Sequence, residues 1–284
     1  MVETNPGLIV AAGQVTFDAE GNDNPDSIYY SRVAHKPPGI SGVTIGRGYD
    51  LGHRGSRDII EKELTDAGID LDAFSGAIGL QGNEAQSWLN ANKDQLPELT
   101  YDQQKKLFEY TYSSMEATVK RICNKSDVVA KYGGTDFDTL NNAILQIVVD
   151  MTFRGDYTPA SRRKVQTLIA NNDFDGFFKA MSDQAYWSNV PSDRFKRRVQ
   201  FLDEAKQDAR ATTTPAAKTQ QAAAPQQPAA SKPATYVVQS GESLSVLAAK
   251  FNTTIDALKA ANTSKLKRWG SVEGFNAGEE IDIP

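Results

Sequence analysis

The alternation of apolar and polar residues predicts a mainly helical region over residues 1–210. Apolar residues recur there at intervals of three and four, the spacing of one face of an α-helix. A first helix is expected to begin at Asn5, with Pro6 in its first turn, and to end at Gly21. Further helices are expected over residues 56–67, 83–94, 100–123, 137–152, 160–171 and 191–209.

Two segments depart from this amphipathic pattern. NNAILQIVVDMTF, residues 141–153, is apolar on almost every side, which is typical of a helix at the centre of a domain. Residues 28–50 are the one convincing strand region, and they include most of the glycine-rich stretch SGVTIGRGYDLG, residues 41–52. We therefore predict an α+β fold in which a short β-hairpin packs at the edge of a helical bundle.

A change in composition divides the chain into two domains. Residues 211–234 contain mostly Ala, Pro, Gln and Thr and no large apolar residue, so we expect a disordered linker between domains at 1–210 and 235–284. The last domain reads as a small βααβ unit formed by TYVVQ, SLSVLAAKF, TIDALKAAN and EEIDIP. Its expected core is Val237, Leu244, Leu247, Ala248, Phe251, Leu258 and Ile281.

Charge and composition exclude several classes of function. The 284-residue chain has a net charge of −5, and residues 1–210 carry 24 basic and 30 acidic side chains, which argues against a broad nucleic-acid surface. No stretch is long and apolar enough for membrane insertion. Cys123 is the only cysteine, and the histidines, His35 and His53, belong to no metal-binding pattern. We therefore expect no disulfide, no metal and no cofactor.

The glycine-rich stretch has no surrounding strand–turn–helix unit typical of a phosphate-binding loop, so glycoside cleavage is the better hypothesis. That reaction needs one carboxylic acid to protonate the leaving oxygen and a second carboxylate to steer water or stabilise the sugar cation. Glu20 ends the first predicted helix, and Thr44 precedes Asp50 by an even number of residues, which places both on one face of a regular strand. Spacing alone leaves open a capping Glu20, a turn-forming Asp50 and a space-filling Thr44.

The same residues carry a resemblance to a known family. FDAEG, residues 17–21, followed by SGVTIGRGYDLG resembles the pesticin-type branch of the phage lysozyme-like muramidases, and SDQAYWSNVPSDRFKRRVQFLDEA resembles that family's C-terminal helices. The resemblance implies Glu20 as general acid, Thr44 as the residue that orients water and Asp50 as the second carboxylate. Tyr49 and Arg47 are expected substrate contacts, with Arg154 and Arg194 as further candidates to line the cleft or anchor a carboxylate.

One departure from the classical phage lysozymes concerns the second carboxylate. Those enzymes place it six residues before the threonine, and that position is Pro38 in this chain. Asp23 and Asp26 lie upstream and remain alternatives to Asp50. The resemblance also leaves open whether the sugar configuration is inverted or retained.

The last domain resembles a LysM domain, a module that binds chitin-like and peptidoglycan glycans. YVVQSGESLSVLAAKFNTTIDALKAAN and AGEEIDIP match its strand, helix and closing patterns. The resemblance implies glycan contacts at Gly241, Glu242, Ser243, Leu244 and Asn262. Trp269, in a loop longer than usual, is expected either to stack on a sugar or to cover the core.

These patterns predict a bacteriolytic lysozyme, a glycosidase that hydrolyses the β-1,4 bond between N-acetylmuramic acid and N-acetylglucosamine. The alternatives are a non-catalytic protein that binds peptidoglycan or chitin, and a chitinase-like enzyme. Expected partners are bacterial peptidoglycan glycan strands and an immunity protein or inhibitor, with no nucleic acid, and we expect a monomer.

The expected site of action is the periplasmic or extracellular cell wall. The first residues lack the basic segment of a signal peptide, so synthesis in the cytoplasm is expected. Delivery would then follow phage lysis, as for an endolysin, or specialised secretion, as for a bacterial effector.

Overall fold

The structure is a computed structural model that describes residues 8–213, 235–238, 244, 247, 251, 253, 255–269, 272–275 and 279–283. The chain divides into two compact units, Met1–Ala211 and Thr212–Pro284. Both contain helices and small antiparallel strand pairs, so the α+β prediction is confirmed. The predicted linker falls almost wholly outside the described residues.

Six helices of the first unit lie where the apolar spacing predicts them: α2 (Arg57–Asp66), α4 (Gly82–Asn92), α5 (Tyr101–Cys123), α7 (Asn142–Arg154), α8 (Pro159–Ala170) and α10 (Ser192–Thr213). The prediction omits three short helices: α3 (Leu71–Phe74), α6 (Ser126–Tyr132) and α9 (Phe174–Met181). It also omits the 3₁₀ turns η1 (Ser75–Ala77) and η2 (Lys93–Gln95). Helix α9 is missed because Gly176 weakens its helical pattern in the sequence. In the structure, the Asp173 side chain accepts from Gly176 N–H and caps the start of the helix.

The first predicted helix is wrong over most of its length. The observed α1 covers only Gln14–Phe17, and residues 8–13 are not helical. The helix cannot begin earlier, because Gly13 has a φ of 78°, which is left-handed and not helical. A Cβ on Gly13 would lie 2.1 Å from the Tyr112 ring, so the backbone runs against α5 at this point. The predicted start at Asn5 and Pro6 lies outside the described residues.

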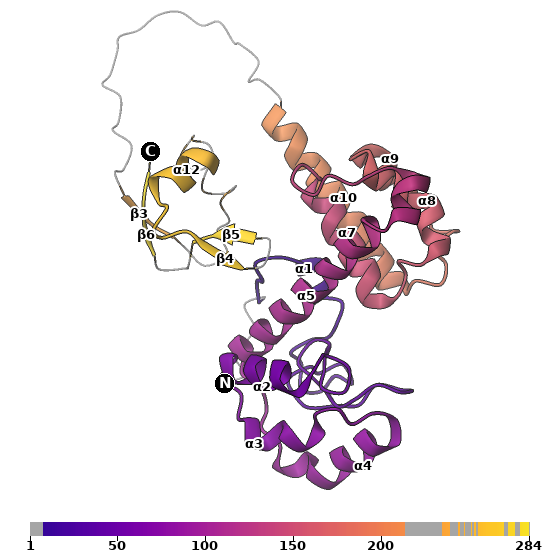
Figure 1. Cartoon of the computed structure of the whole chain (residues 1–284), viewed down its shortest axis with the longest axis vertical. Helices are drawn as coiled ribbons and strands as arrows, with labels where there is room; N and C mark the ends of the chain where they lie inside the picture. Colours follow the sequence, from indigo (N-terminus) through magenta and orange to yellow (C-terminus); the bar gives the residue numbers. More distant parts are fainter. Residues whose placement is uncertain are drawn as a thin grey trace, which may run out of the picture. The chain divides into compact units, whose positions relative to one another are not determined.

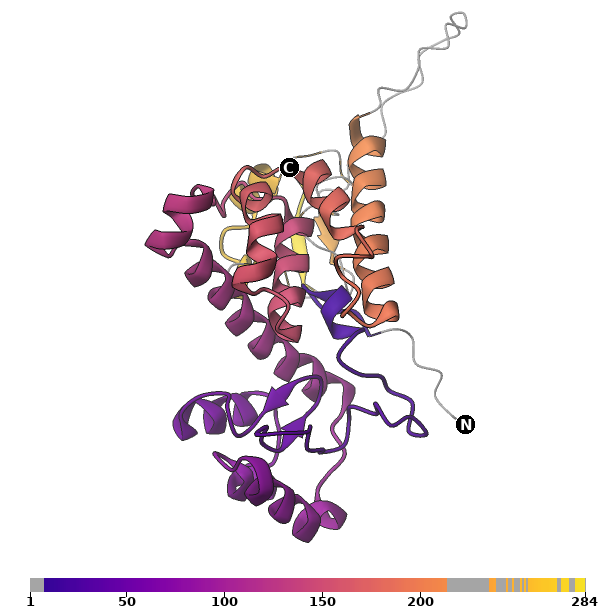
Figure 2. The same cartoon turned by 90° about the vertical axis from the view of Figure 1, so that its right-hand side faces the viewer.

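Helix α5 connects two separate hydrophobic cores of the first unit. It runs from the group of α2, α3 and α4 to the group of α7, α8, α9 and α10 (Figures 1 and 2). Leu107 of α5 packs in the core that also holds the hairpin, whereas the next residue, Phe108, packs in the other core. We call these the hairpin core and the α7 core.

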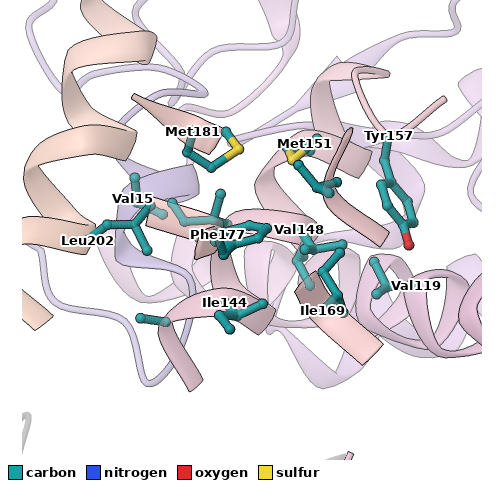
Figure 3. Packing of buried hydrophobic residues seen from close by; sticks show 14 of the residues in the cluster. Val15, Val119, Ile144, Val148, Met151, Tyr157, Ile169, Phe177, Met181 and Leu202 are labelled. Atoms are coloured by element: carbon teal, nitrogen blue, oxygen red, sulfur yellow. The ribbon is translucent and has the colours of Figure 1, made fainter. Parts of the chain in front are cut away.

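The α7 core confirms that residues 141–153 form a buried central helix. Ile144, Ile147 and Val149 of α7 are fully buried. Val15 of α1 and Leu202 of α10 belong to the same cluster (Figure 3). Burial of side chains from α1, α7 and α10 in one core fixes the ends of these helices relative to one another, and those ends carry the charged residues considered below.

The glycine-rich stretch forms the predicted hairpin, with β1 (Thr44–Ile45) paired antiparallel to β2 (Tyr49–Asp50). Its alternation decides which side chains are buried, because successive residues of a strand point to opposite faces. Ile45 and Tyr49 face each other and are fully buried in the hairpin core. Thr44 and Asp50 face each other on the opposite side.

The second unit contains the predicted first and last strands, β3 (Thr235–Val237) and β6 (Glu280–Asp282), paired antiparallel, and the predicted helix α12 (Ile255–Ala261). The long loop holds a hairpin that the sequence does not predict, formed by β4 (Lys267–Trp269) and β5 (Val272–Gly274). The buried core is Val238, Leu244, Leu247, Leu258, Phe275, Ile281 and Ile283. Of the other expected core residues, Phe251 is half-buried and Ala248 lies outside the described residues.

One expected core residue of this unit is wrong. Val237 is 46% exposed, and its neighbour Val238 is buried in its place. The pairing with β6 sets this register, because Val237 lies opposite the exposed Glu280 while Tyr236 lies opposite the buried Ile281. A shift of one residue along a strand exchanges the two faces.

Candidate functional site

Glu20 lies three residues after the end of α1, in a turn that continues from the helix. Its backbone N–H donates to the Thr16 carbonyl at 3.0 Å. Gly21 then allows the chain to pass close to a neighbouring segment, since a Cβ there would lie 2.7 Å from the Ser31 Cβ. The Glu20 side chain keeps 22% of its surface exposed. The structure thus places Glu20 in the turn that follows α1, with its carboxylate partly accessible to solvent.

A buried arginine from α10 holds one oxygen of Glu20. Arg194 Nη1 donates to Glu20 Oε1 at 2.7 Å. The same guanidinium donates to both carboxylate oxygens of Asp150 in α7, at 2.6 and 3.2 Å. Burial alone would lower the pKa of Arg194, but Asp150 and Glu20 raise it above its ordinary value, so the side chain stays charged.

Asp150 is the centre of this buried charge network. It has no exposed surface, and Arg198 Nε also donates to it, at 2.6 Å. Burial tends to raise the pKa of Asp150, yet Arg198 and Arg194 hold it below its usual value. Arg198 extends the network to Asp156, which pairs with Arg154. Asp150 therefore holds the Arg194 guanidinium in place, and Arg194 in turn orients the Glu20 carboxylate.

The second oxygen of Glu20 faces the turn of the hairpin. A Cβ on Gly48 would lie 3.9 Å from Glu20 Oε2 and 3.5 Å from the Phe153 ring. Gly48 has a φ of 89°, a conformation that a residue with a side chain adopts only under strain. Among the described residues, Oε2 accepts no hydrogen bond. Glu20 and the hairpin are therefore brought together with one carboxylate oxygen available for chemistry.

Thr44 and Asp50 are direct neighbours across the two strands. They occupy a pair without mutual backbone hydrogen bonds, since Leu51 N–H donates to the Val43 carbonyl and Thr44 pairs with His35 on its other side. In such pairs the Cα atoms are about 4.5 Å apart and the side chains approach closely. Thr44 is 4% exposed, and its Oγ1 has no hydrogen-bond partner in the part of the chain that the structure describes.

The Asp50 carboxylate organises the loops that flank the hairpin. Its Oδ1 accepts from the N–H groups of Gly42, at 3.0 Å, and Gly52, at 2.8 Å. Its Oδ2 lies 3.1 Å from Nδ1 of His53. Asp50 is 26% exposed, so it is both fixed by backbone donors and open to solvent. Sequence spacing predicts that Asp50 and Thr44 share one face of a strand. In the structure they share a face as cross-strand partners of the hairpin.

Tyr49 is a core residue and not a substrate contact. Strand alternation turns it away from Thr44 and Asp50, and it has no exposed surface. Its hydroxyl donates to Glu63 Oε2 at 2.7 Å, and Arg54 binds the same carboxylate. Burial and Glu63 together raise the pKa of Tyr49, so the phenol stays neutral.

Arg47 is likewise committed to the protein and not to a ligand. It is 4% exposed, it donates to the Phe17 carbonyl at 2.6 Å and to Asp23 Oδ2 at 2.7 Å, and it lies over the Phe17 ring. The Asp23 side chain is 1% exposed and also accepts from Gln104, so it forms part of the support of the hairpin. Asp26, by contrast, is exposed to solvent.

In the second unit the predicted glycan contacts divide into three groups. Gly241, Glu242 and Ser243 lie outside the described residues, as does the side chain of Trp269. Leu244 is buried in the small core, which leaves its side chain little surface for a sugar. Asn262 is 1% exposed and joins α12 to β6: it donates to the Leu258 and Asp282 carbonyls and accepts from Asp282 N–H at 2.7 Å.

The bonds of Asn262 make it a structural residue, and this is testable. Asn262→Ala would leave buried backbone groups of α12 and β6 without partners, which costs about 1–3 kcal/mol for each group. We expect the second unit to unfold at lower temperature, with the helices of the first unit unchanged. Differential scanning calorimetry of the whole chain measures this. Thr263→Ala, an exposed neighbour, is the control and is expected to change stability by less than about 0.5 kcal/mol.

The described residues contain no group of three or more histidine, cysteine, aspartate or glutamate side chains placed to hold a metal ion. Within the same residues, no helix combines the length and apolar character needed to cross a bilayer. Cys123 is a buried free thiol that contacts the Tyr157 hydroxyl.

The fold defines a two-unit α+β protein. Residues 236–268 match the LysM domain, which makes the second unit a peptidoglycan- or chitin-binding module. Residues 13–199, more than half of the chain, match a family described as a domain of unknown function, DUF8812, and the chain belongs to that family. No curated protein matches the chain.

Two residues of the candidate site, Asp150 and His53, are not predicted from the sequence. Asp150 is the single acidic residue in the apolar segment 141–153, and a lone charge on a buried helix is the signal that could have identified it. His53 follows Asp50 by three residues, close enough in a turn for their side chains to meet, but the metal patterns considered for histidine do not include that arrangement.

Proposed function

We propose that this protein is an N-acetylmuramidase that hydrolyses the β-1,4 bond between N-acetylmuramic acid and N-acetylglucosamine in peptidoglycan. The observation that carries the proposal is the juxtaposition of Glu20 with the hairpin, where its Oε2 faces Gly48 and accepts no hydrogen bond among the described residues. The resemblance of FDAEG and SGVTIGRGYDLG to pesticin-type muramidases supports the same assignment.

In this proposal Glu20 is the general acid. Arg194 fixes Oε1, so the proton given to the glycosidic oxygen would be carried on Oε2, the atom that faces the hairpin. Protonation of the leaving oxygen is the step that a positioned carboxylic acid accelerates most. The buried Asp150–Arg194 pair keeps the Glu20 side chain in one orientation through the reaction.

Thr44 and Asp50 would act on the attacking water. The Thr44 hydroxyl can both donate and accept, and a water that accepts from it could at the same time donate to the Asp50 carboxylate on the neighbouring strand. Asp50 would also stabilise positive charge that develops on the sugar ring. Backbone donors at Gly42 and Gly52 hold it in place for both tasks.

The LysM unit would supply attachment to the wall. The first domain has a net negative charge, so it lacks long-range attraction to anionic wall polymers. A tethered glycan-binding module raises the effective concentration of substrate at the first unit without new contacts there. We further propose that the protein acts at the periplasmic or extracellular wall after release by phage lysis or specialised secretion.

A second candidate function is wall binding without catalysis. The hydrogen bonds of Asp50 to loop amides favour it, because they give that carboxylate a structural purpose. Purified peptidoglycan and chitin, each incubated with the protein, separate the possibilities. The muramidase proposal predicts soluble reducing sugars from peptidoglycan at a rate at least tenfold above that from chitin. Sedimentation with the wall without any release of sugar would establish the binding function instead.

A further inference from the structure

We propose that His53 is a positioning residue that fixes the orientation of the Asp50 carboxylate for catalysis. The inference rests on the proposed function, because it assigns a role within the same site. His53 Nδ1 lies 3.1 Å from Asp50 Oδ2, and the two residues belong to one turn of the chain. The turn itself is well formed, with the N–H groups of His53 and Arg54 both donating to the Asp50 carbonyl.

The two oxygens of Asp50 are held differently. Oδ1 accepts short hydrogen bonds from Gly42 and Gly52 N–H, whereas Oδ2 has His53 as its nearest donor and a longer contact of 3.3 Å to Gly42 N–H. Backbone amides therefore hold Oδ1, and the imidazole of His53 adds the nearest restraint on Oδ2 and so on rotation of the carboxylate plane. A water held between Asp50 and Thr44 depends on this angle, since its hydrogen bonds weaken steeply when misaligned.

The other charged groups near this turn have partners elsewhere. Arg54 binds Glu63, and Arg57 at the start of α2 binds Glu61. Lys36, on the segment before the hairpin, donates to the Gly39 carbonyl. Within the described residues, Asp50 is thus the acidic group that His53 contacts, and His53 is the side-chain donor to Asp50.

The chain offers a matched control, because it has only one other histidine. His35 is exposed, and its Nδ1 lies 3.4 Å from the carbonyl of Val33 in its own segment. His35 pairs with the hairpin through backbone groups, which a change of side chain leaves in place. Removing the His35 ring therefore tests for a general effect of losing an imidazole near the hairpin.

The experiment compares His53→Ala, His53→Asn and His35→Ala in the full chain, with soluble un-crosslinked peptidoglycan glycan strands as substrate. We expect His53→Ala to lower kcat about tenfold with KM changed less than twofold, since the loss falls on the orientation of a reacting group. An asparagine side chain can donate from its amide at nearly the position of the imidazole Nδ1, so His53→Asn should recover kcat to within about threefold of wild type. Added imidazole should partly restore His53→Ala, because the His53 side chain is 39% exposed.

Three outcomes would overturn the inference. They are wild-type kcat in His53→Ala, an equal loss in His35→Ala, and a loss in His53→Ala that neither asparagine nor imidazole restores. The proposed function fails in a different way, through a wild-type protein that releases no sugar from the strands. An active wild type with an inactive Glu20→Gln variant and a fully active His53→Ala variant would reject the role of His53 alone.

Discussion

Glu20→Gln is expected to lower the rate of peptidoglycan cleavage by about 10³-fold, within the 10²–10⁴ range of general acid catalysis. The amide cannot give a proton to the glycosidic oxygen. Its carbonyl oxygen can still accept from Arg194, so the side chain should keep its place and the fold should not change. The loss should therefore appear in kcat, with binding to the wall unaltered.

The matching control is Glu84→Gln, which removes an exposed carboxylate from the first turn of α4. It should retain at least half of the wild-type rate. Release of reducing sugars from purified walls gives the rates, and sedimentation with walls gives the binding. A Glu20→Gln variant that retains full activity would exclude Glu20 as the acid and with it the proposed mechanism.

Asp150→Asn is expected to lower the free energy of unfolding of the first unit by about 3–5 kcal/mol. The substitution leaves two buried guanidinium groups, from Arg194 and Arg198, without the carboxylate that both contact. Because Arg194 also loses the carboxylate that holds it in place, the rate of peptidoglycan cleavage should fall as well. Urea unfolding followed by the helical circular dichroism signal measures the stability change.

Asp203→Asn serves as the control for charge removal, because Asp203 is exposed on α10. It should change stability by less than about 0.5 kcal/mol. An Asp150→Asn variant as stable as this control would show that the buried network contributes nothing to the fold.

The pH dependence of the same pair gives a further check. Asp150 has a pKa held below its usual value in the folded protein, so the unfolded chain takes up the proton first as pH falls. The stabilisation is fully present above an ordinary carboxyl pKa of about 4 and is lost as pH falls through the folded pKa. The difference in stability between wild type and Asp150→Asn should therefore be constant near neutral pH and shrink below about pH 4.

The elements of this protein that sequence predicts well are those decided by local pattern. The period of apolar residues gives α5 nearly to the residue, because that helix buries one face along its whole length. It gives the end of α7 to within two residues but places its start five residues too early, since the helix begins only after the cap at Asn141. The same alternation that places Asp50 beside Thr44 also places Tyr49 in the core. Tyr49 is an expected substrate contact because it precedes Asp50 in the sequence, but adjacent residues of a strand point to opposite faces.

The parts that sequence cannot predict depend on distant contacts. The bond between Arg194 and Glu20 joins residues 174 positions apart, and no local pattern encodes it. Arg47 lies between two glycines in the candidate site, yet its partners, Phe17 and Asp23, draw it into the protein interior. Val237 and Val238 are equivalent in hydrophobicity, and only pairing with β6 decides which one is buried.

The most direct test of the muramidase assignment is the identity of the reducing end released from purified peptidoglycan. The protein is incubated with walls, the soluble fragments are reduced, and mass spectrometry identifies the terminal sugar. The proposal predicts N-acetylmuramic acid at the new reducing ends with wild-type protein and no such ends above background with Glu20→Gln. New reducing ends that carry N-acetylglucosamine, or walls that bind the wild-type protein and remain intact, would contradict it.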